Sequence, residues 1–139
     1  GPEPFDEAFT AEHLRDAVNR SRRAIKTQLL SQRVVAGVGN IYADEALWRA
    51  RVHPASRRLG PARAAALRDA VVAVLAEAVT HGGTTLRDYR QVDGGEGRNQ
   101  LRLECYGRHG QPCRRCGDEL ARSVIDARTT TFCRRCQRR

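Results

Sequence analysis

Four cysteines near the C-terminal end of the sequence have the spacing of a metal site. Cys113, Cys116, Cys133 and Cys136 form the pattern C-x2-C-x16-C-x2-C, in which each pair can close a short knuckle on one tetrahedral Zn²⁺. Four thiolates leave no open coordination position, so we expect one structural Zn²⁺ that supplies folding free energy and does no chemistry. Two disulfides or a redox pair are the alternatives. A cytosolic setting and the lack of a βαβ pattern around either pair disfavour both.

The fifth cysteine stands apart from this pattern. Cys105 lies in the run "LRLECYG" at 101–107, where apolar and polar residues alternate. Alternation with a period of two is typical of a β-strand that has one buried face. We therefore predict a half-buried strand cysteine at this position, rather than a replacement ligand or a nucleophile.

Two β-rich runs between the cysteine pairs predict a hairpin. "ELARSVID" at 119–126 and "TTTFC" at 129–133 are separated by Ala127 and Arg128, which places Arg128 near the tip. Both cysteine pairs read "CRRC", so four further arginines surround the metal site. Such a dense positive field on one small element favours a polyanionic partner over a finger that is merely soluble.

The charge of the whole chain supports the same kind of partner. The 139 residues carry 25 basic and 16 acidic side chains, a net charge of +9, and residues 98–139 hold eleven arginines against four acids. No apolar stretch approaches the roughly 20 residues of a membrane span, and the first residues lack the basic and apolar regions of a secretory signal. We expect a folded cytoplasmic protein with no membrane partner, whose C-terminal part faces a polyanion.

Helical periodicity dominates the first part of the chain. Thr10 is a candidate N-cap of the first helix, and the third should end at the His53-Pro54 pair, since the residue before proline is pushed out of the α region. The further helices are predicted at about 24–31, 41–52 and 61–83. The fold class is thus mainly α with a small β hairpin in a zinc finger. The predicted division is a helical domain at 1–90, a linker at 91–100 and a four-cysteine zinc-finger domain at 101–139.

The turn before the third helix could be a phosphate site. Residues 34–40 read "VVAGVGN", where Gly37 and Gly39 lack the third glycine of a dinucleotide fingerprint and the Lys-Ser/Thr of a P-loop. Nucleotide binding is therefore disfavoured. What remains is a glycine turn that places Asn40 at an N-cap, beside free backbone N–H groups with a partial positive charge. Ordinary capping and the clamping of a phosphate both stay open for Asn40.

Several of these segments together resemble one family. "GPEPF", "AIKTQLLSQRVVAGVGNIYADEALWRARVHP", "GGTTLRDY", "YGRHGQPCRRCG" and "RTTTFCRRCQ" resemble the C-terminal half of bacterial formamidopyrimidine-DNA glycosylase, of the same superfamily as endonuclease VIII. The resemblance covers nearly the whole chain, and its motifs are long and in order. It implies a helix-two-turn-helix domain followed by a zinc finger, both gripping damaged double-stranded DNA.

The resemblance also implies which side chains hold the DNA. By the family's motifs, Lys26 lies near the phosphates that flank the lesion and Asn40 clamps a phosphate at the lesion. Tyr106 is expected to contact the backbone, and Arg128 corresponds to the arginine of the hairpin tip. The roles implied for Asn40 and for Arg128 agree with what the residues alone indicate.

No catalytic group of the family is expected in this chain. Members begin with a proline whose free amine attacks C1′ of the damaged nucleotide, followed by a glutamate, at the head of an N-terminal β-sandwich domain. Pro2-Glu3 echoes that pair, but Gly1 blocks the amine, and "GPEP" matches the family's interdomain linker. We expect the DNA-binding C-terminal part of a base-excision-repair glycosylase and AP lyase of the formamidopyrimidine or 8-oxoguanine type, inactive alone and monomeric. Its expected partners are damaged duplex DNA and the parent's N-terminal catalytic domain, on the bacterial nucleoid.

Other interpretations stay open at this point. The chain could be a stand-alone, non-catalytic binder of duplex nucleic acid, or a metal- or thiol-dependent enzyme in its own right. Lesion preference is also open, because Arg98 and Asn99 stand where relatives usually carry aromatic residues that cap an extruded 8-oxoguanine.

Overall fold

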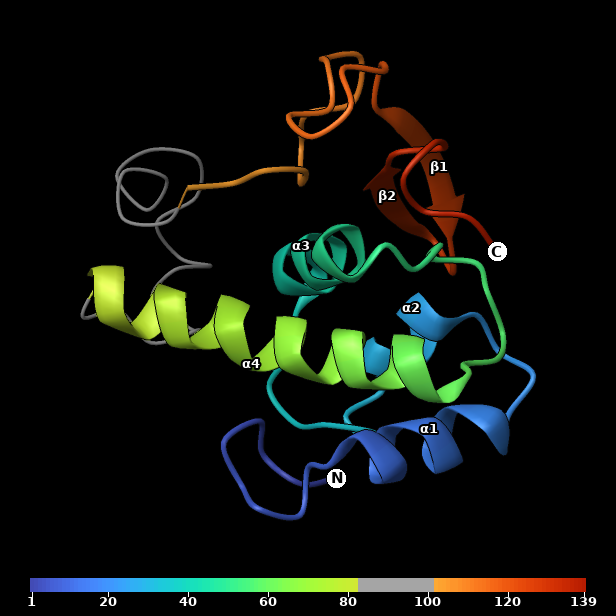
Figure 1. Ribbon diagram of the computed structural model, residues 1–139, viewed down its shortest axis with the longest axis vertical. Helices are drawn as coiled ribbons and strands as arrows, with labels where there is room; N and C mark the ends of the chain where they lie inside the picture. The colour runs from blue at the N-terminus through green and yellow to red at the C-terminus, as the bar shows by residue number, and fades with distance from the viewer. Residues whose placement is uncertain (83–101) are drawn as a thin grey trace.

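The computed structural model describes residues 1–82 and 102–139, which form four helices and one two-stranded sheet. Figure 1 shows the hairpin and its flanking loops on one side of the helical part. The fold class expected from the sequence is confirmed. No helix in these two ranges is long and apolar enough to cross a membrane. The elements are α1 (Ala11–Asn19), α2 (Ile25–Leu30), α3 (Asn40–Ala50), α4 (Pro61–Gly82), β1 (Ala121–Ile125) and β2 (Arg128–Phe132).

The helices pack around one apolar core. Thr10 caps α1 as expected, since its hydroxyl accepts a hydrogen bond of 3.0 Å from the His13 N–H. α4 lies across α1 and α3 (Figure 1). The apolar residues of α4 recur with a period of 3.6, and they are buried in this core: Leu67, Val71, Val74, Leu75 and Ala78.

α3 lies between α4 and the hairpin, so both of its faces are covered (Figure 1). Eight of its eleven residues are buried, including the acidic pair Asp44 and Glu45. The helix ends at Ala50, before the expected boundary at His53-Pro54, because Arg51 adopts the left-handed conformation with φ 61°. The next residue, Val52, then forms a parallel bridge with Arg138. The left-handed residue Arg51, rather than the proline, ends the helix.

The hairpin forms with Arg128 next to its tip, but the turn lies one residue earlier than the Ala127-Arg128 pair that the sequence predicted. β1 and β2 pair antiparallel from Ala121 with Phe132 to Ile125 with Arg128. The two-residue turn is Asp126-Ala127, with φ of 53° and 66°, the positive values that a tight hairpin turn requires at both positions. Arg128 is the first residue after this turn and is exposed.

The zinc-finger part has a small core of its own, to which the helical part contributes Trp48. The other members are Cys105, Cys113, Leu120 and Cys133. Cys105 is fully buried in an irregular segment, so the predicted half-buried strand at 101–107 is wrong over its described residues. The alternation there reflects side chains that pack against α3, without a partner strand. The predicted linker at 91–100, with Arg98 and Asn99, lies outside the described residues.

Candidate metal centre and nucleic-acid interface

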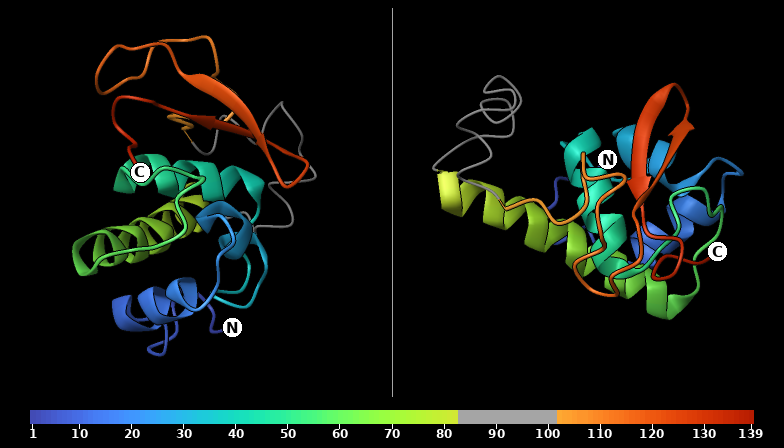
Figure 2. Two further views of the ribbon diagram at one scale, coloured as in Figure 1. Left: turned by 90° about the vertical axis from the view of Figure 1, so that its right-hand side faces the viewer. Right: turned by 90° about the horizontal axis from the view of Figure 1, so that it is seen from above.

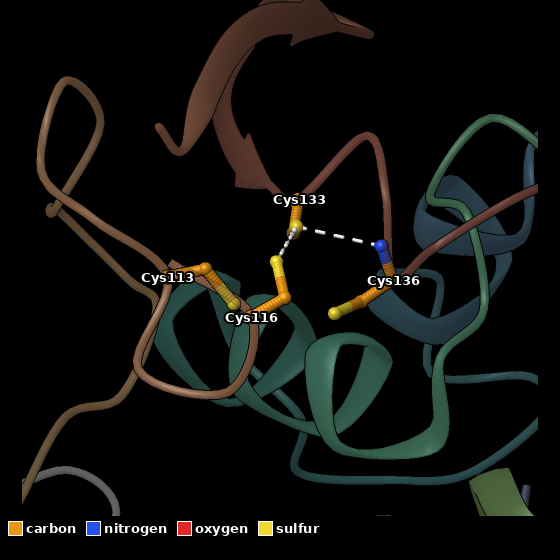
Figure 3. A group of neighbouring side chains, drawn as sticks. All are labelled: Cys113, Cys116, Cys133 and Cys136. Atoms are coloured by element: carbon orange, nitrogen blue, oxygen red, sulfur yellow. Dashed lines mark hydrogen bonds between the residues drawn. The ribbon is translucent and has the colours of Figure 1, made fainter. Parts of the chain in front are cut away.

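The four cysteines of the predicted metal site come together from two knuckles. The sulfur atoms of Cys113, Cys116, Cys133 and Cys136 all lie within 4.8 Å of one another (Figure 3). A tetrahedron with Zn–S bonds of about 2.3 Å has edges of roughly 3.8 Å, which this cluster can meet with small adjustments. The donor set is all thiolate and closed, as in a structural zinc site. These residues fit one Zn²⁺, and the predicted ligand set is confirmed as a cluster.

Donors from α3 and from the first knuckle surround the thiolates. The indole N–H of Trp48 points at the Cys113 sulfur, 3.4 Å away, and the Arg115 Nε lies 3.3 Å from the Cys136 sulfur. The Arg115 guanidinium also stacks over the Trp48 ring at 4.1 Å and donates to the Trp48 carbonyl at 2.8 Å. Such donors stabilise the negative charge that four thiolates bring to a metal. The metal cluster is therefore tied directly to the C-terminal part of α3.

Gln137 ties the second knuckle to the same helix end. Its buried amide donates to the Val52 carbonyl at 3.0 Å and accepts from the Cys133 N–H at 2.8 Å. One side chain thus satisfies two buried backbone groups of different parts of the chain. Sequence reasoning had assigned Gln137 no role, because its partner Val52 is not a sequence neighbour.

Three of the four predicted nucleic-acid contacts line one hollow. We call it the phosphate hollow: a depression of about 410 Å³ lined by Leu30, Gln32, Val38, Gly39, Asn40, Ile41, Tyr106 and Arg128. The lining comes from the end of α2, the glycine turn, the start of α3, the segment at 106 and the hairpin tip. Its charged and polar groups come from three segments distant in the sequence.

Asn40 is not the N-cap that the sequence predicted. Gly39 holds that position with extended backbone and no side-chain cap, and Asn40 is the first residue of α3. Its amide donates instead to the Thr129 carbonyl at 3.3 Å, and its Oδ1 is buried without a partner among the described residues. The first N–H groups of α3 are therefore free of a side-chain cap at the edge of the phosphate hollow. A helix N-terminus of this kind offers a partial positive charge to an anion.

Lys26 is fully buried and does not line the phosphate hollow. Its ammonium lies 2.8 Å from Asp44 Oδ1 and donates to the Thr130 hydroxyl at 2.8 Å and to the Thr129 carbonyl at 3.0 Å. These three partners match its three N–H donors, so none is left for a phosphate in this arrangement. Burial lowers the pKa of Lys26 and raises the pKa of Asp44 to about 6. Lys26 holds the second hairpin strand directly beside Arg128.

Glu45 positions the segment that carries Tyr106. Its carboxylate accepts three backbone N–H groups, from Glu104 at 2.8 Å and from Cys105 and Tyr106 at 2.7 Å each. Burial raises the pKa of Glu45, while the three N–H donors favour its charged form. Glu45 was not singled out from the sequence. The one signal was an acidic pair in the middle of an otherwise apolar helix, "IYADEALW".

The environment of Cys105 disfavours the reactive thiolate form of its side chain. Burial raises the pKa of its thiol far above the ordinary value, and its sulfur lies 3.1 Å from the Thr131 carbonyl. The role expected for it as a packed residue, and neither ligand nor nucleophile, agrees with these contacts.

Two family models match nearly the whole described chain. That of the formamidopyrimidine-DNA glycosylase H2TH domain matches residues 1–90, and that of the zinc finger found in FPG and IleRS matches residues 110–139. The formamidopyrimidine-DNA glycosylase of Roseiflexus sp. (strain RS-1) is 50% identical over 99% of this chain and 51% of its own length. That of Synechococcus sp. is 48% identical over 99% of this chain and 49% of its own length. The chain thus spans about half the length of the curated relatives it matches.

Solved structures show the same relation. The MutM (Fpg) protein of Thermus thermophilus is 49% identical, with a TM-score of 0.85 over 99% of this chain and 53% of its own. A Lactococcus lactis formamidopyrimidine-DNA glycosylase, bound non-covalently to DNA with an AP site, is 36% identical, with a TM-score of 0.86 over 100% of this chain and 50% of its own. With both family regions, the metal cluster and the helical fold in agreement, the chain belongs to the formamidopyrimidine-DNA glycosylase family, through its H2TH and zinc-finger regions.

Proposed function

We propose that this chain is the DNA-binding part of a base-excision-repair glycosylase and AP lyase, and that it holds damaged duplex DNA by its backbone phosphates. The observation that carries the proposal is the phosphate hollow, where Asn40, Tyr106 and Arg128 meet the uncapped start of α3. A guanidinium, a phenol, an amide and a helix N-terminus are all groups that bind phosphate oxygens. We propose that these groups contact the backbone and not the edges of the bases.

Solved relatives support a contact with damaged DNA. Lactococcus lactis structures have been solved with DNA that contains an abasic site and with Fapy-dG DNA, and MutM has been solved with DNA that contains a carbocyclic 8-oxo-G. These relatives are about twice as long as this chain. We place base excision and strand cleavage on the residues that they carry beyond the matched region. The chain then acts as a monomer beside that catalytic part, on the bacterial nucleoid in the cytoplasm.

Zn²⁺ has a structural role in this proposal. The metal holds the two knuckles, the knuckles hold the hairpin, and the hairpin presents Arg128 to the phosphate hollow. The role we propose for Lys26 differs from the phosphate contact that its motif implies. We propose that Lys26 positions β2 through its hydrogen bonds to the Thr129 carbonyl and the Thr130 hydroxyl.

The test is a titration of the 139-residue chain with a duplex that contains an abasic-site analogue, at several salt concentrations. A contact with phosphates predicts that log K falls by about 0.9 per contacted phosphate for each log unit of salt. Selectivity for the lesion over undamaged duplex should be small, since the proposed contacts read no base. Affinity that does not depend on salt, or no binding of duplex at all, would contradict the proposal.

A further inference from the structure

A second group of arginines lies away from the phosphate hollow. Arg20, Arg22, Arg57 and Arg58 are exposed and, with Asn19 and Ser21, line a separate hollow of about 410 Å³. We call this surface the arginine shoulder. Among the residues that the structure describes, none of the four guanidinium groups has an ion pair or a hydrogen bond.

The fold holds these arginines together from two distant segments. The Asn19 amide donates to the Leu59 carbonyl at 3.0 Å, and its carbonyl accepts from the Leu59 N–H at 2.9 Å. The Ile25 N–H also donates to the Ser56 carbonyl at 2.7 Å. Figure 2 (left) shows the end of α1 and the loop after α3 on the side that faces the viewer. The Asn19 side chain and one backbone hydrogen bond therefore hold together the two segments that carry the four arginines.

Solubility alone does not explain this arrangement. The stretches at 20–23 and 56–58 read "RSRR" and "SRR" and contain no acid. Some other surface arginines do lie beside carboxylates, as in the pairs Arg68–Asp69 and Arg102–Glu104. Soluble surfaces generally mix the two signs of charge, because clustered like charges repel. A surface that clusters one sign and leaves every group unpaired fits an anionic partner.

The arginine shoulder continues toward the phosphate hollow. A third hollow, of about 360 Å³, shares Arg20 and Ser21 with the shoulder and extends to His13 and Arg33. Arg33 directly follows Gln32, which lines the phosphate hollow. α2 spans the distance between the two sites, with Ile25 at the shoulder end and Leu30 at the phosphate hollow. Its six residues correspond to about 9 Å.

We propose that the arginine shoulder is a second phosphate-binding surface, which holds the backbone of the same DNA duplex several base pairs from the phosphates held in the phosphate hollow. The inference rests on the proposed function, since it extends that contact along the DNA. Each base pair advances a duplex by about 3.4 Å, so the length of α2, about 9 Å, corresponds to roughly three base pairs. Arginine suits this role, because its planar fork binds two phosphate oxygens at once.

The test compares two double variants of equal charge. Arg22→Gln with Arg58→Gln removes two guanidinium groups from the shoulder, and Arg15→Gln with Arg51→Gln removes two exposed ones outside all three hollows. On a duplex of about 20 base pairs, the shoulder variant should bind roughly tenfold more weakly at low salt, with a salt slope smaller by about 1.8. The control variant should lose less than about twofold, because it removes net charge without a phosphate contact.

A shorter duplex separates the two sites. On a DNA hairpin with a stem of about two base pairs, roughly 7 Å long and so shorter than the distance that α2 spans between the two sites, the shoulder variant should bind within about twofold of the unsubstituted chain. An Arg128→Ala variant should be weakened on both lengths. Equal losses in the shoulder and control variants, or a shoulder loss that is the same on both lengths, would overturn the inference and leave the proposed function intact. Failure of the unsubstituted chain to bind either DNA would overturn both.

Discussion

Buried charges position the exposed side chains that we propose contact DNA. Lys26 binds the Thr129 backbone and the Thr130 side chain, in the two residues that follow Arg128. Glu45 binds three consecutive backbone N–H groups that end at Tyr106. Arg128 and Tyr106 are the DNA-contacting residues that we propose in the zinc-finger part. The backbone next to each of them is thus held by a buried charged side chain. Rigid support of this kind lowers the entropy that binding would otherwise cost.

Lys26→Met should destabilise the fold more at pH 8 than at pH 5.5. At pH 8 it leaves the buried Asp44 carboxylate without its ion-pair partner, which costs about 3–5 kcal/mol. Asp44 already has a pKa raised to about 6 by burial, and loss of the Lys26 charge raises that pKa further. A carboxyl group whose pKa is raised on folding stabilises the folded state at low pH, where it is protonated. This contribution to stability is lost as pH rises through the raised pKa. Denaturant melts should therefore show a loss smaller by at least about 1 kcal/mol at pH 5.5.

The double variant Lys26→Met with Asp44→Asn is the control for this prediction. It lacks both titrating groups, so its difference from the Lys26→Met single variant should shrink as pH falls. A Lys26→Met loss that is equal at the two pH values would show that the ion pair does not account for the stability of this site.

Glu45→Gln should loosen the segment that carries Tyr106. The amide keeps one acceptor oxygen but turns an NH2 group toward backbone N–H groups that now have no partner. We expect a loss of about 3 kcal/mol in the free energy of unfolding, because unsatisfied buried donors are costly. Denaturant melts measure the stability, and titration with duplex DNA should show weaker binding. Normal stability in the variant would remove Glu45 from its positioning role.

Local sequence patterns identified the metal ligands and the hairpin tip better than they identified the buried residues that position them. The cysteine spacing and the hairpin tip are encoded within short stretches, and both were predicted, the tip to within one residue. The inward orientation of Lys26 depends on Asp44 and on Thr129, which is 103 residues away. The contacts of Glu45 span 59 to 61 residues. A pattern read along the chain cannot show such pairs, because they exist only after the hairpin packs on α3.

At the scale of elements, α3 connects every part of the site. Its first residues line the phosphate hollow, its middle holds Asp44 and Glu45, and Trp48 near its end donates to Cys113. Its existence was predictable from periodicity, but both of its ends were placed wrongly, by one or two residues. Gly39 takes the N-cap and Asn40 turns to the hairpin, because Thr129 offers the amide a carbonyl that only the folded chain provides.

Trp48→Phe should weaken the metal site while the helices stay folded. Phenylalanine keeps most of the packing but loses the N–H that points at the Cys113 sulfur, and it weakens the stacking under Arg115. Loss of a donor next to the ligand shell typically costs about 10–100-fold in metal affinity, and we expect about tenfold here. Competition with a chromophoric chelator measures this, and far-UV circular dichroism controls for folding. Unchanged zinc affinity would show that this donor does not act on the metal.

At the scale of the whole molecule, two cores meet at one helix. The larger core is formed by the four helices, and the smaller one by Leu120 and the cysteines with Trp48. The sequence predicted two parts but not their contact, since the residues that join them are apolar or acidic positions of α3. The metal does not line the phosphate hollow; we propose that it affects the hollow by holding the hairpin that carries Arg128.

Removal of zinc should abolish DNA binding before it unfolds the helices. The residues from about 102 to 139 depend on the metal, whereas α1 to α4 keep their own apolar core. Chelation should leave most helical circular dichroism intact and reduce affinity for duplex more than about tenfold, because Tyr106 and Arg128 leave the phosphate hollow. Added zinc should restore binding. A single cooperative transition that removes helices and finger together would contradict this division.

The central claim is that Asn40 and Arg128, from separate parts of the fold, hold one stretch of DNA backbone. The most direct measurement is a double-mutant cycle of Asn40→Ala and Arg128→Ala, titrated with abasic-site duplex at two salt concentrations, with thermal melts of each variant. Arg128→Ala should cost about 1.5–3 kcal/mol of binding and reduce the salt slope by about one. Since Gly39 is the N-cap, Asn40→Ala should lose affinity with little loss of stability. The two losses should be non-additive by at least about 0.5 kcal/mol. Additive losses, or an Arg128 variant that binds normally, would contradict a shared phosphate site.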